Sequence, residues 1–318
     1  MTRDMGYINE LLWGYRASRI LQVANGLDIF TILAGQALSV QRVAEQCNTK
    51  LDMTEKLLIC CVAMGLLNKD GDKYRNSDLA SQYLVKGARL YQGNMIAHSA
   101  VVWEFWDKLD EHIRLRPSGP ISPAQQHRDF ILAMKNSALA WRANMLLATV
   151  NLDGRRKLLD VGGGPGTYSI ELCRKYPELK ATVFELPETF TITERNIFEE
   201  DMQDRVWVQQ GNWETDDFGS DNDVVLLSNI LHGPNSRASM KLQKSYDSML
   251  PGSLLIIQDF VLNDEKTGPV VPALFNIMVG AYSRKELFEL IGRAVFENVK
   301  VVADNPRNGA TWITAEKR

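Results

Sequence analysis

The chain has 318 residues, 45% of them hydrophobic and 24% charged, as expected of a globular protein with one large or two ordinary domains. Its 36 basic and 39 acidic residues give a formal charge of −3, which provides no general attraction to nucleic acid or anionic membranes. The chain begins without a signal-peptide pattern, and its longest strongly apolar stretch, residues 57–67, is too short to span a bilayer. The four cysteines form no metal-binding pattern. We therefore expect a cytoplasmic protein without nucleic-acid, membrane or metal partners.

The N-terminal region has the order of elements found in a winged helix. Apolar residues recur at helical spacing over residues 11–27, and two further helices are expected at 39–47 and 52–64. Two short strands, 66–68 and 73–75, then flank a turn. The pattern predicts a winged-helix-like domain over residues 1–90.

Residues 91–152 are expected to form longer helices rich in large apolar side chains, with a loop at 116–120 and a hinge at 151–154. Most of these side chains are expected to belong to the core. Some can line a pocket for a small molecule, because such pockets are largely apolar and aromatic. The candidates are Trp103, Trp106 and Met145, together with Phe275 and Met278 from a later segment.

From residue 157 onward, strands alternate with helices. Strands are expected at 158–161, 181–184, 205–208, 223–228 and 254–258, with helices at 168–176 and 235–250. This alternation predicts a Rossmann-like α/β domain over residues 153–318, with a parallel sheet covered on both faces. The chain ends in a hairpin, 299–302 and 311–315, which makes the last strand antiparallel.

A glycine-rich loop connects the first of these strands to its helix. Gly162, Gly164 and Gly166 let the backbone turn sharply and approach a ligand closely. A dinucleotide site would require G-x-G-x-x-G, and Thr167 stands where its last glycine would fall. An acidic residue, Asp160, precedes the glycines and can attract the ammonium group of a bound amino acid. The spacing suits a cofactor without a pyrophosphate and predicts S-adenosylmethionine.

The ends of the following strands supply further candidates for the cofactor. Glu185 ends the second strand about twenty residues beyond the loop, where a carboxylate can accept both ribose hydroxyls. Asn212 can bond the adenine edge, and Trp213 can pack on its face, although ordinary packing explains Trp213 almost as well. The predicted cofactor-binding residues are Asp160, Gly162, Gly164, Gly166, Glu185, Leu186, Gly211, Asn212, Trp213 and Asn229.

A histidine and an aspartate lie at the carboxyl ends of neighbouring strands. Ligands bind at this edge of open α/β sheets. His232 can take a proton from a hydroxyl as a methyl group moves, and Asp259 can hold the imidazole in the correct tautomer. The alternative is that His232 is a surface or helix-capping residue. We expect His232 and Asp259 to be the catalytic pair.

Three stretches together resemble a known family. Residues 158–166, the stretch Phe184-Glu185-Leu186-Pro187 and the pair Leu231-His232 are similar to the dimeric class I O-methyltransferases. These include plant caffeate-type enzymes, acetylserotonin methyltransferases and bacterial relatives acting on polyketides and pigments. The resemblance covers nearly the whole chain and implies an S-adenosylmethionine-dependent enzyme with a small-molecule acceptor. It also implies a homodimer formed through the N-terminal domain, with His232 as general base and Asp259 as its assisting acid.

The sequence departs from the family at three places. The family usually continues its histidine with Asp-Trp, whereas Gly233-Pro234 follows here. It often has aspartate where Asn212 stands, and its second assisting glutamate would fall near Ala281. These departures leave two alternatives open. One is a hydroxylase or decarboxylase that retains the cofactor, since one fold hosts several reactions. The other is a winged-helix DNA-binding regulator, although residues 52–64 carry little charge for phosphate contact.

Overall fold

The computed structural model describes residues 4–115, 119, 121–307 and 309–318. The chain forms two compact units, one of residues 1–120 with 262–279 and one of residues 121–261 with 280–318. Most of the predicted loop at 116–120 lies outside the described residues. Segment 121–152 thus belongs to the unit that contains the large sheet, and the predicted division into three functional domains stays a prediction.

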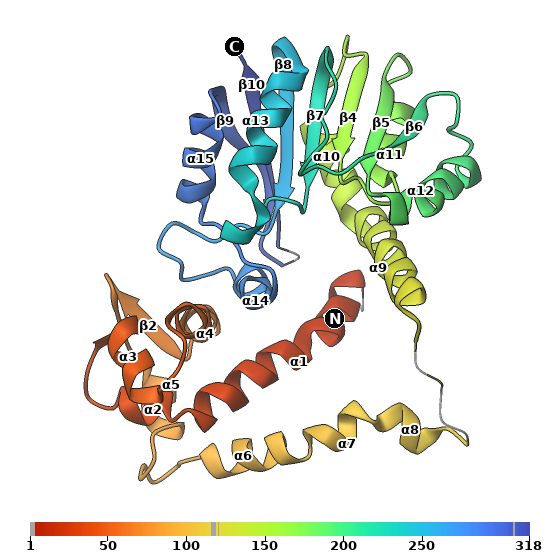
Figure 1. Cartoon of the computed structure of the whole chain (residues 1–318). Helices are drawn as coiled ribbons and strands as arrows, with labels where there is room; N and C mark the ends of the chain where they lie inside the picture. Colours follow the sequence, from red (N-terminus) through yellow and green to blue (C-terminus); the bar gives the residue numbers. More distant parts are fainter. Residues whose placement is uncertain (1–3, 116–118, 120, 308) are drawn as a thin grey trace. The chain divides into compact units, whose positions relative to one another are not determined.

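The first unit is mainly helical, with a small sheet (Figure 1). Its strands lie in the order β1-β3-β2, all antiparallel. Strands β2 and β3 form the predicted hairpin after α3 and α4, whereas β1 precedes α3 and was not predicted. No described helix of the chain combines the length and apolarity needed to cross a membrane. The elements of this unit are α1 (Met5–Gly26), α2 (Ile29–Ile32), β1 (Leu38–Ser39), α3 (Val40–Cys47), α4 (Leu51–Ala63), β2 (Leu67–Asp70), β3 (Lys73–Asn76), α5 (Asp78–Tyr83), α6 (Gly93–Val101), α7 (Trp103–Asp107), α8 (Leu109–Ile113) and α14 (Val270–Met278).

Helix α4, the candidate recognition helix, is buried within its own chain. Five consecutive residues, 57–61, are buried, and α14 packs against the helix. The Cys60 thiol donates a hydrogen bond to the Ala273 carbonyl, with 3.0 Å between Sγ and O. A segment some 210 residues later in the same chain thus covers the apolar surface of α4. The buried residues of this helix therefore belong to the core of their own unit.

The second unit contains a seven-stranded sheet in the order β6-β5-β4-β7-β8-β10-β9 (Figure 1). Strand β10 is antiparallel to both of its neighbours, and the pairs among β4 to β8 are parallel, as the sequence predicted. The strands are β4 (Lys157–Val161), β5 (Lys180–Glu185), β6 (Val206–Gln210), β7 (Asn222–Ser228), β8 (Met249–Asp259), β9 (Phe296–Asn305) and β10 (Ala310–Lys317). The helices are α9 (Pro123–Ser137), the π-helix η1 (Ala138–Arg142), α10 (Ala143–Thr149), α11 (Thr167–Lys175), α12 (Pro187–Glu199), the 3₁₀-helix η2 (Pro234–Ser236), α13 (Ala238–Ser248) and α15 (Arg284–Arg293).

Two apolar layers sandwich this sheet, because successive side chains of a strand point to opposite faces. Leu158 packs with residues of α10, α11 and α12 on one face, and its neighbour Leu159 packs with α13 and α15 on the other. Strand β7 alternates in the same way, with Leu226 on the first face and Leu227 on the second. Helices therefore cover both faces, and polar groups concentrate at the strand ends.

The register of the sheet brings the ends of the strands to one edge. Glu185 pairs with Gln210, and Ser228 pairs with Gln258 in a parallel register. The glycine loop follows β4 at the same edge, since the amide of Gly162 bonds to the Phe184 carbonyl at 2.8 Å. The sheet thus places the predicted cofactor and catalytic residues along one line.

Candidate active site

The glycine loop has the backbone conformation that its spacing predicted. Gly162, Gly164 and Gly166 have φ values of 65°, 55° and 73°, a region that favours glycine. A Cβ atom at Gly162 would lie 3.0 Å from the Ile230 side chain and 3.6 Å from the indole of Trp213. The loop therefore lies directly against the segments that follow β6 and β7.

Asp160 is fully buried below this loop. Its Oδ2 accepts a hydrogen bond from the Ser169 hydroxyl at 2.8 Å, and its Oδ1 has no partner among the described residues. Burial raises the pKa of the Asp160 carboxyl from 3.8 to about 7, against the hydrogen bond from Ser169. Buried polar atoms are rarely left unpaired, so Oδ1 is available to a cationic group that enters with a ligand.

Glu185 ends β5 and bonds to the loop itself. Its Oε2 accepts from the Gly164 amide at 2.8 Å and its Oε1 from the Leu186 amide at 2.9 Å. Burial raises the pKa of the Glu185 carboxyl, and the two backbone hydrogen bonds oppose this shift. Each carboxylate oxygen can accept a second hydrogen bond, so the group remains able to bind a ribose diol.

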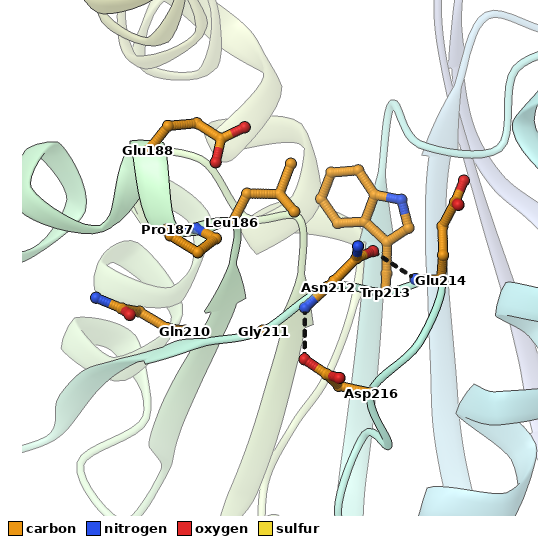
Figure 2. A pocket seen from close by; sticks show the side chains of 9 residues that line it. All are labelled: Leu186, Pro187, Glu188, Gln210, Gly211, Asn212, Trp213, Glu214 and Asp216. Carbon is orange, nitrogen blue, oxygen red and sulfur yellow. Dashed lines mark hydrogen bonds between the residues drawn. The ribbon is translucent and has the colours of Figure 1, made fainter.

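A pocket of about 660 Å³ opens between the ends of β5 and β6 (Figure 2). Leu186 and Trp213 point into it, and four of the predicted cofactor residues line it: Leu186, Gly211, Asn212 and Trp213. The Asn212 side-chain oxygen accepts from the Glu214 amide at 2.9 Å, and the Asn212 amide donates to Asp216 at 2.9 Å. The pocket thus combines apolar side chains such as Leu186 and Trp213 with polar ones such as Asn212, a mixture that suits a nucleoside.

Pocket residues that sequence analysis missed include Asp216 and Glu188. The backbone amide of Asn212 donates a hydrogen bond to the Asp216 carboxylate, and this hydrogen bond lowers the pKa of Asp216. A polar residue six positions after the end of β6 was the available signal, but many loops contain one.

Two further predicted cofactor residues, Asn229 and Trp213, follow strands β7 and β6. Asn229 follows β7 with a positive φ of 54°, and its amide bonds to the Gln258 carbonyl at 2.8 Å. Its buried side-chain oxygen has no partner among the described residues. Trp213 packs on the hydrophobic core as well as lining the pocket, so ordinary packing applies and its stacking on an adenine stays a prediction.

His232 and Asp259 form the pair that the sequence predicted. His232 Nδ1 lies 2.8 Å from Asp259 Oδ1, and the side chains are 22% and 3% exposed. The Asp259 carboxylate also accepts from the backbone amides of Leu231 and Phe260, at 3.1 and 2.8 Å. These amides hold the carboxylate in place, so it accepts the Nδ1 proton and leaves Nε2 as the basic nitrogen.

The region of the missing family acids is filled by backbone and by neutral groups. Gly233 approaches Gly280 so closely that a Cβ atom on Gly233 would lie 2.8 Å from the Gly280 Cα. The Tyr282 hydroxyl hydrogen-bonds to Ser236, and burial raises its pKa. His232 therefore depends on Asp259 for its orientation.

The candidates for the acceptor pocket lie in both units. Trp106 and Met278 are 63% and 62% exposed, and Phe275 packs edge-on against Trp13 with 5.9 Å between ring centroids. Trp103 lies near Tyr15 in the same unit, at 6.4 Å. Met145 packs against the core of the sheet unit. Their part in acceptor binding stays a prediction.

Comparison with known proteins gives the family. Residues 122–296 match the O-methyltransferase domain, and residues 9–86 match the O-methyltransferase dimerisation domain. The chain belongs to the O-methyltransferase family. The predicted fold, an α/β methyltransferase sheet with an antiparallel C-terminal strand and an N-terminal helical dimerisation domain, is confirmed. The enzyme is an S-adenosylmethionine-dependent O-methyltransferase of small molecules, as the sequence predicted.

Individual relatives span nearly the whole methyltransferase. It is 30% identical to a 3-hydroxy-5-methyl-1-naphthoate 3-O-methyltransferase of Streptomyces sahachiroi, over 87% of this chain and 84% of that protein. It is 25% identical to an acetylserotonin O-methyltransferase of Gallus gallus, over 94% and 95%. A solved O-methyltransferase family 2 protein from Planctomyces limnophilus, in complex with apigenin, shares the fold, with a TM-score of 0.85, 24% identity and coverage of 100% and 97%.

Proposed function

We propose that His232 is the general base of this methyltransferase and that Asp259 positions it. The observation that carries this proposal is the 2.8 Å contact between His232 Nδ1 and a carboxylate held by two backbone amides. It directs the lone pair of Nε2 away from Asp259 and fixes the ring. In the reaction, Nε2 would take the proton of the acceptor hydroxyl.

The residues around the glycine loop fit S-adenosylmethionine. When bound, this cofactor supplies a methyl group on a sulfonium, which is an excellent leaving group. Asp160 Oδ1, buried and without a partner among the described residues, is suited to its ammonium group. Glu185 can accept the ribose hydroxyls, and the pocket at Leu186 and Trp213 is suited to the adenine. The chain's own contribution to the transfer is to align the acceptor oxygen with the methyl group, and such alignment can lower the activation barrier by about several kcal/mol.

We expect the acceptor to carry a hydroxyl on an aromatic ring. Curated relatives are named for a hydroxynaphthoate and for acetylserotonin, and a protein of the same fold was solved with apigenin. A phenol-type hydroxyl has a pKa near that of tyrosine, about 10, so it is mostly protonated at neutral pH. A histidine that accepts its proton during the transfer therefore makes the oxygen a better nucleophile.

Saturating S-adenosylhomocysteine should raise the melting temperature of the purified protein by about 2–5 °C, because a ligand that binds only the folded state stabilises it. Differential scanning fluorimetry measures this shift. NADH serves as the control and should produce none, since the loop lacks the dinucleotide spacing. No response to millimolar S-adenosylhomocysteine contradicts the proposed cofactor site.

We also propose that the enzyme is a homodimer formed through its N-terminal domain. This region matches the family's dimerisation domain. In the single chain, α1 and α7 leave large apolar side chains exposed, among them Leu11 at 61%, Leu12 at 58% and Trp106 at 63%. Exposed apolar area of this kind marks an association surface.

The double substitution Leu11→Glu with Leu12→Glu should convert the dimer to a monomer, because it places two charges in an apolar interface. Light scattering after size-exclusion chromatography gives the mass. Phe198→Glu, an equally drastic change at a residue of the other unit that is 71% exposed, should leave the dimer intact. A double variant that remains dimeric removes α1 from the interface.

A further inference from the structure

Arg142 is a buried cation without a counter-ion. It ends η1, and its residue is 4% exposed. Its Nε has no hydrogen-bond partner, and no carboxylate lies within ion-pair distance of it among the described residues. An isolated charge inside a protein is strongly disfavoured, because burial removes its hydration. A position of this kind calls for a partner that the chain does not itself provide.

Aromatic and neutral polar groups surround the Arg142 guanidinium. The guanidinium lies 5.5 Å from the centre of the Phe260 ring, which offers only its π face. The Tyr168 hydroxyl hydrogen-bonds to Arg142 and Ser228, and burial raises its pKa, so it remains neutral. Ser228 in turn bonds to Gln258, whose Nε2 has no partner among the described residues. Two buried donors of this cluster, Arg142 Nε and Gln258 Nε2, thus have no partner among the described residues, and a carboxylate of a bound molecule can accept from the first.

The location of Arg142 connects it to the methyl-transfer site. Tyr168 is the second residue of α11, the helix that begins directly after the glycine loop. Phe260 follows Asp259, and its ring lies 6.4 Å from the His232 imidazole, centroid to centroid. Arg142 itself ends a five-residue π-helix between α9 and α10, and such insertions are frequent at functional sites. Arg142 thus shares the neighbour Phe260 with His232, and it contacts the helix that follows the glycine loop through Tyr168.

We propose that Arg142 is a ligand-binding residue whose guanidinium pairs with a carboxylate of a molecule bound in the methyl-transfer site. Arginine suits this task because its planar group binds a carboxylate through two parallel hydrogen bonds. The carboxylate has two sources: the methionine end of the cofactor, or an acidic group on the acceptor such as that of a naphthoate. The inference rests on the proposed function, since both molecules belong to that site.

Isothermal titration of wild type, Arg142→Met and Arg142→Lys with two nucleosides tests the first source. S-adenosylhomocysteine carries the amino-acid carboxylate, whereas 5′-methylthioadenosine lacks the amino-acid end. If Arg142 binds the cofactor, Arg142→Met should lower the affinity for S-adenosylhomocysteine at least about 30-fold, since one partner of a buried charge pair is lost. The affinity for methylthioadenosine should change by less than about 3-fold. Arg142→Lys should give an intermediate loss, because a lysine keeps the charge without the two-pronged geometry.

A second titration tests the acceptor as the source. Enzyme loaded with S-adenosylhomocysteine is titrated with 3-hydroxy-1-naphthoate and with its carboxamide. If Arg142 binds the acceptor, the preference for the acid over the amide is lost in Arg142→Met, and the affinity for S-adenosylhomocysteine is unchanged. If neither preference changes in Arg142→Met or in Arg142→Lys, the proposal is overturned.

Arg205→Met is the matched control. Arg205 donates to the backbone carbonyls of Cys173 and Pro177, so its loss should lower the melting temperature and leave both preferences unchanged. Arg142→Met removes no ion pair of the ligand-free chain and should not lower the melting temperature. If Arg142→Met greatly lowers the melting temperature and leaves both ligand preferences unchanged, Arg142 has a structural role and the proposal is overturned. Wild type that binds neither nucleoside contradicts the proposed cofactor site itself, a result distinct from these.

Discussion

His232→Asn should lower kcat by roughly 10²- to 10⁴-fold, the range that a positioned general base contributes. Asparagine fills similar space and retains a group that can hydrogen-bond to Asp259, which lies 2.8 Å from the imidazole in the wild type. It cannot take the proton from a hydroxyl. Steady-state kinetics with an aromatic hydroxyl compound that the wild type methylates measures this loss, and the affinity for S-adenosylhomocysteine should be unchanged.

The pH profile distinguishes a lost base from a damaged site. The residual activity of His232→Asn should rise with pH toward about 10, because the acceptor then ionises without help. Asp259→Asn keeps the shape of the side chain but removes the negative charge that the Nδ1 proton faces. It should therefore lower kcat less than His232→Asn does. If turnover of His232→Asn equals that of the wild type at neutral pH, the histidine has no part in proton transfer.

Asp160→Asn should lower the affinity for S-adenosylhomocysteine on the order of 100-fold at pH 8, because the ammonium group of the ligand loses a buried carboxylate partner. In the ligand-free wild type, burial raises the pKa of Asp160 from 3.8 to about 7. The ammonium group binds the ionised form, so the wild-type affinity should rise with pH and level off above about 7. Calorimetric titration across this range, with methylthioadenosine as the ligand lacking an ammonium group, isolates the effect.

The same carboxyl makes a prediction about the ligand-free protein. A carboxyl whose pKa is raised on folding contributes stability that is present below its unfolded pKa and lost as the pH rises through the folded pKa. From about pH 4 to pH 7, the melting temperature of the wild type should therefore fall relative to that of Asp160→Asn. If the melting temperatures of the wild type and Asp160→Asn change with pH in the same way, Asp160 is not a buried, unpaired carboxyl.

The sequence predicted most of the sheet unit because its signals are local. Strands β7 and β8 contain the apolar runs 224–227 and 254–257, and the positive φ values of Gly162, Gly164 and Gly166 follow from their spacing. The pairing of His232 with Asp259 also followed from local signals, since parallel strands end at one edge.

Other features depend on contacts between distant segments and had no local signal. The covering of α4 by α14 needs residues some 210 positions apart to meet. The isolation of Arg142 is a property of everything packed around it, and an arginine in a helical stretch ordinarily indicates a solvated surface. The hydrogen bond from the Gly164 amide to Glu185 likewise depends on how two strand ends meet.

The contact between Gly233 and Gly280 has a consequence for how this enzyme can diverge. Gly233 has a φ of 62°, and each glycine occupies the space that a side chain on the other would need. Restoring the family's aspartate after the histidine would therefore require the backbone near residue 280 to move as well. Any substitution at either glycine adds atoms to a contact that has no room for them, so the two positions are constrained together. An acid directly after the histidine is compatible only with a different path of the backbone near residue 280, and with the present path Asp259 is the acid that contacts His232.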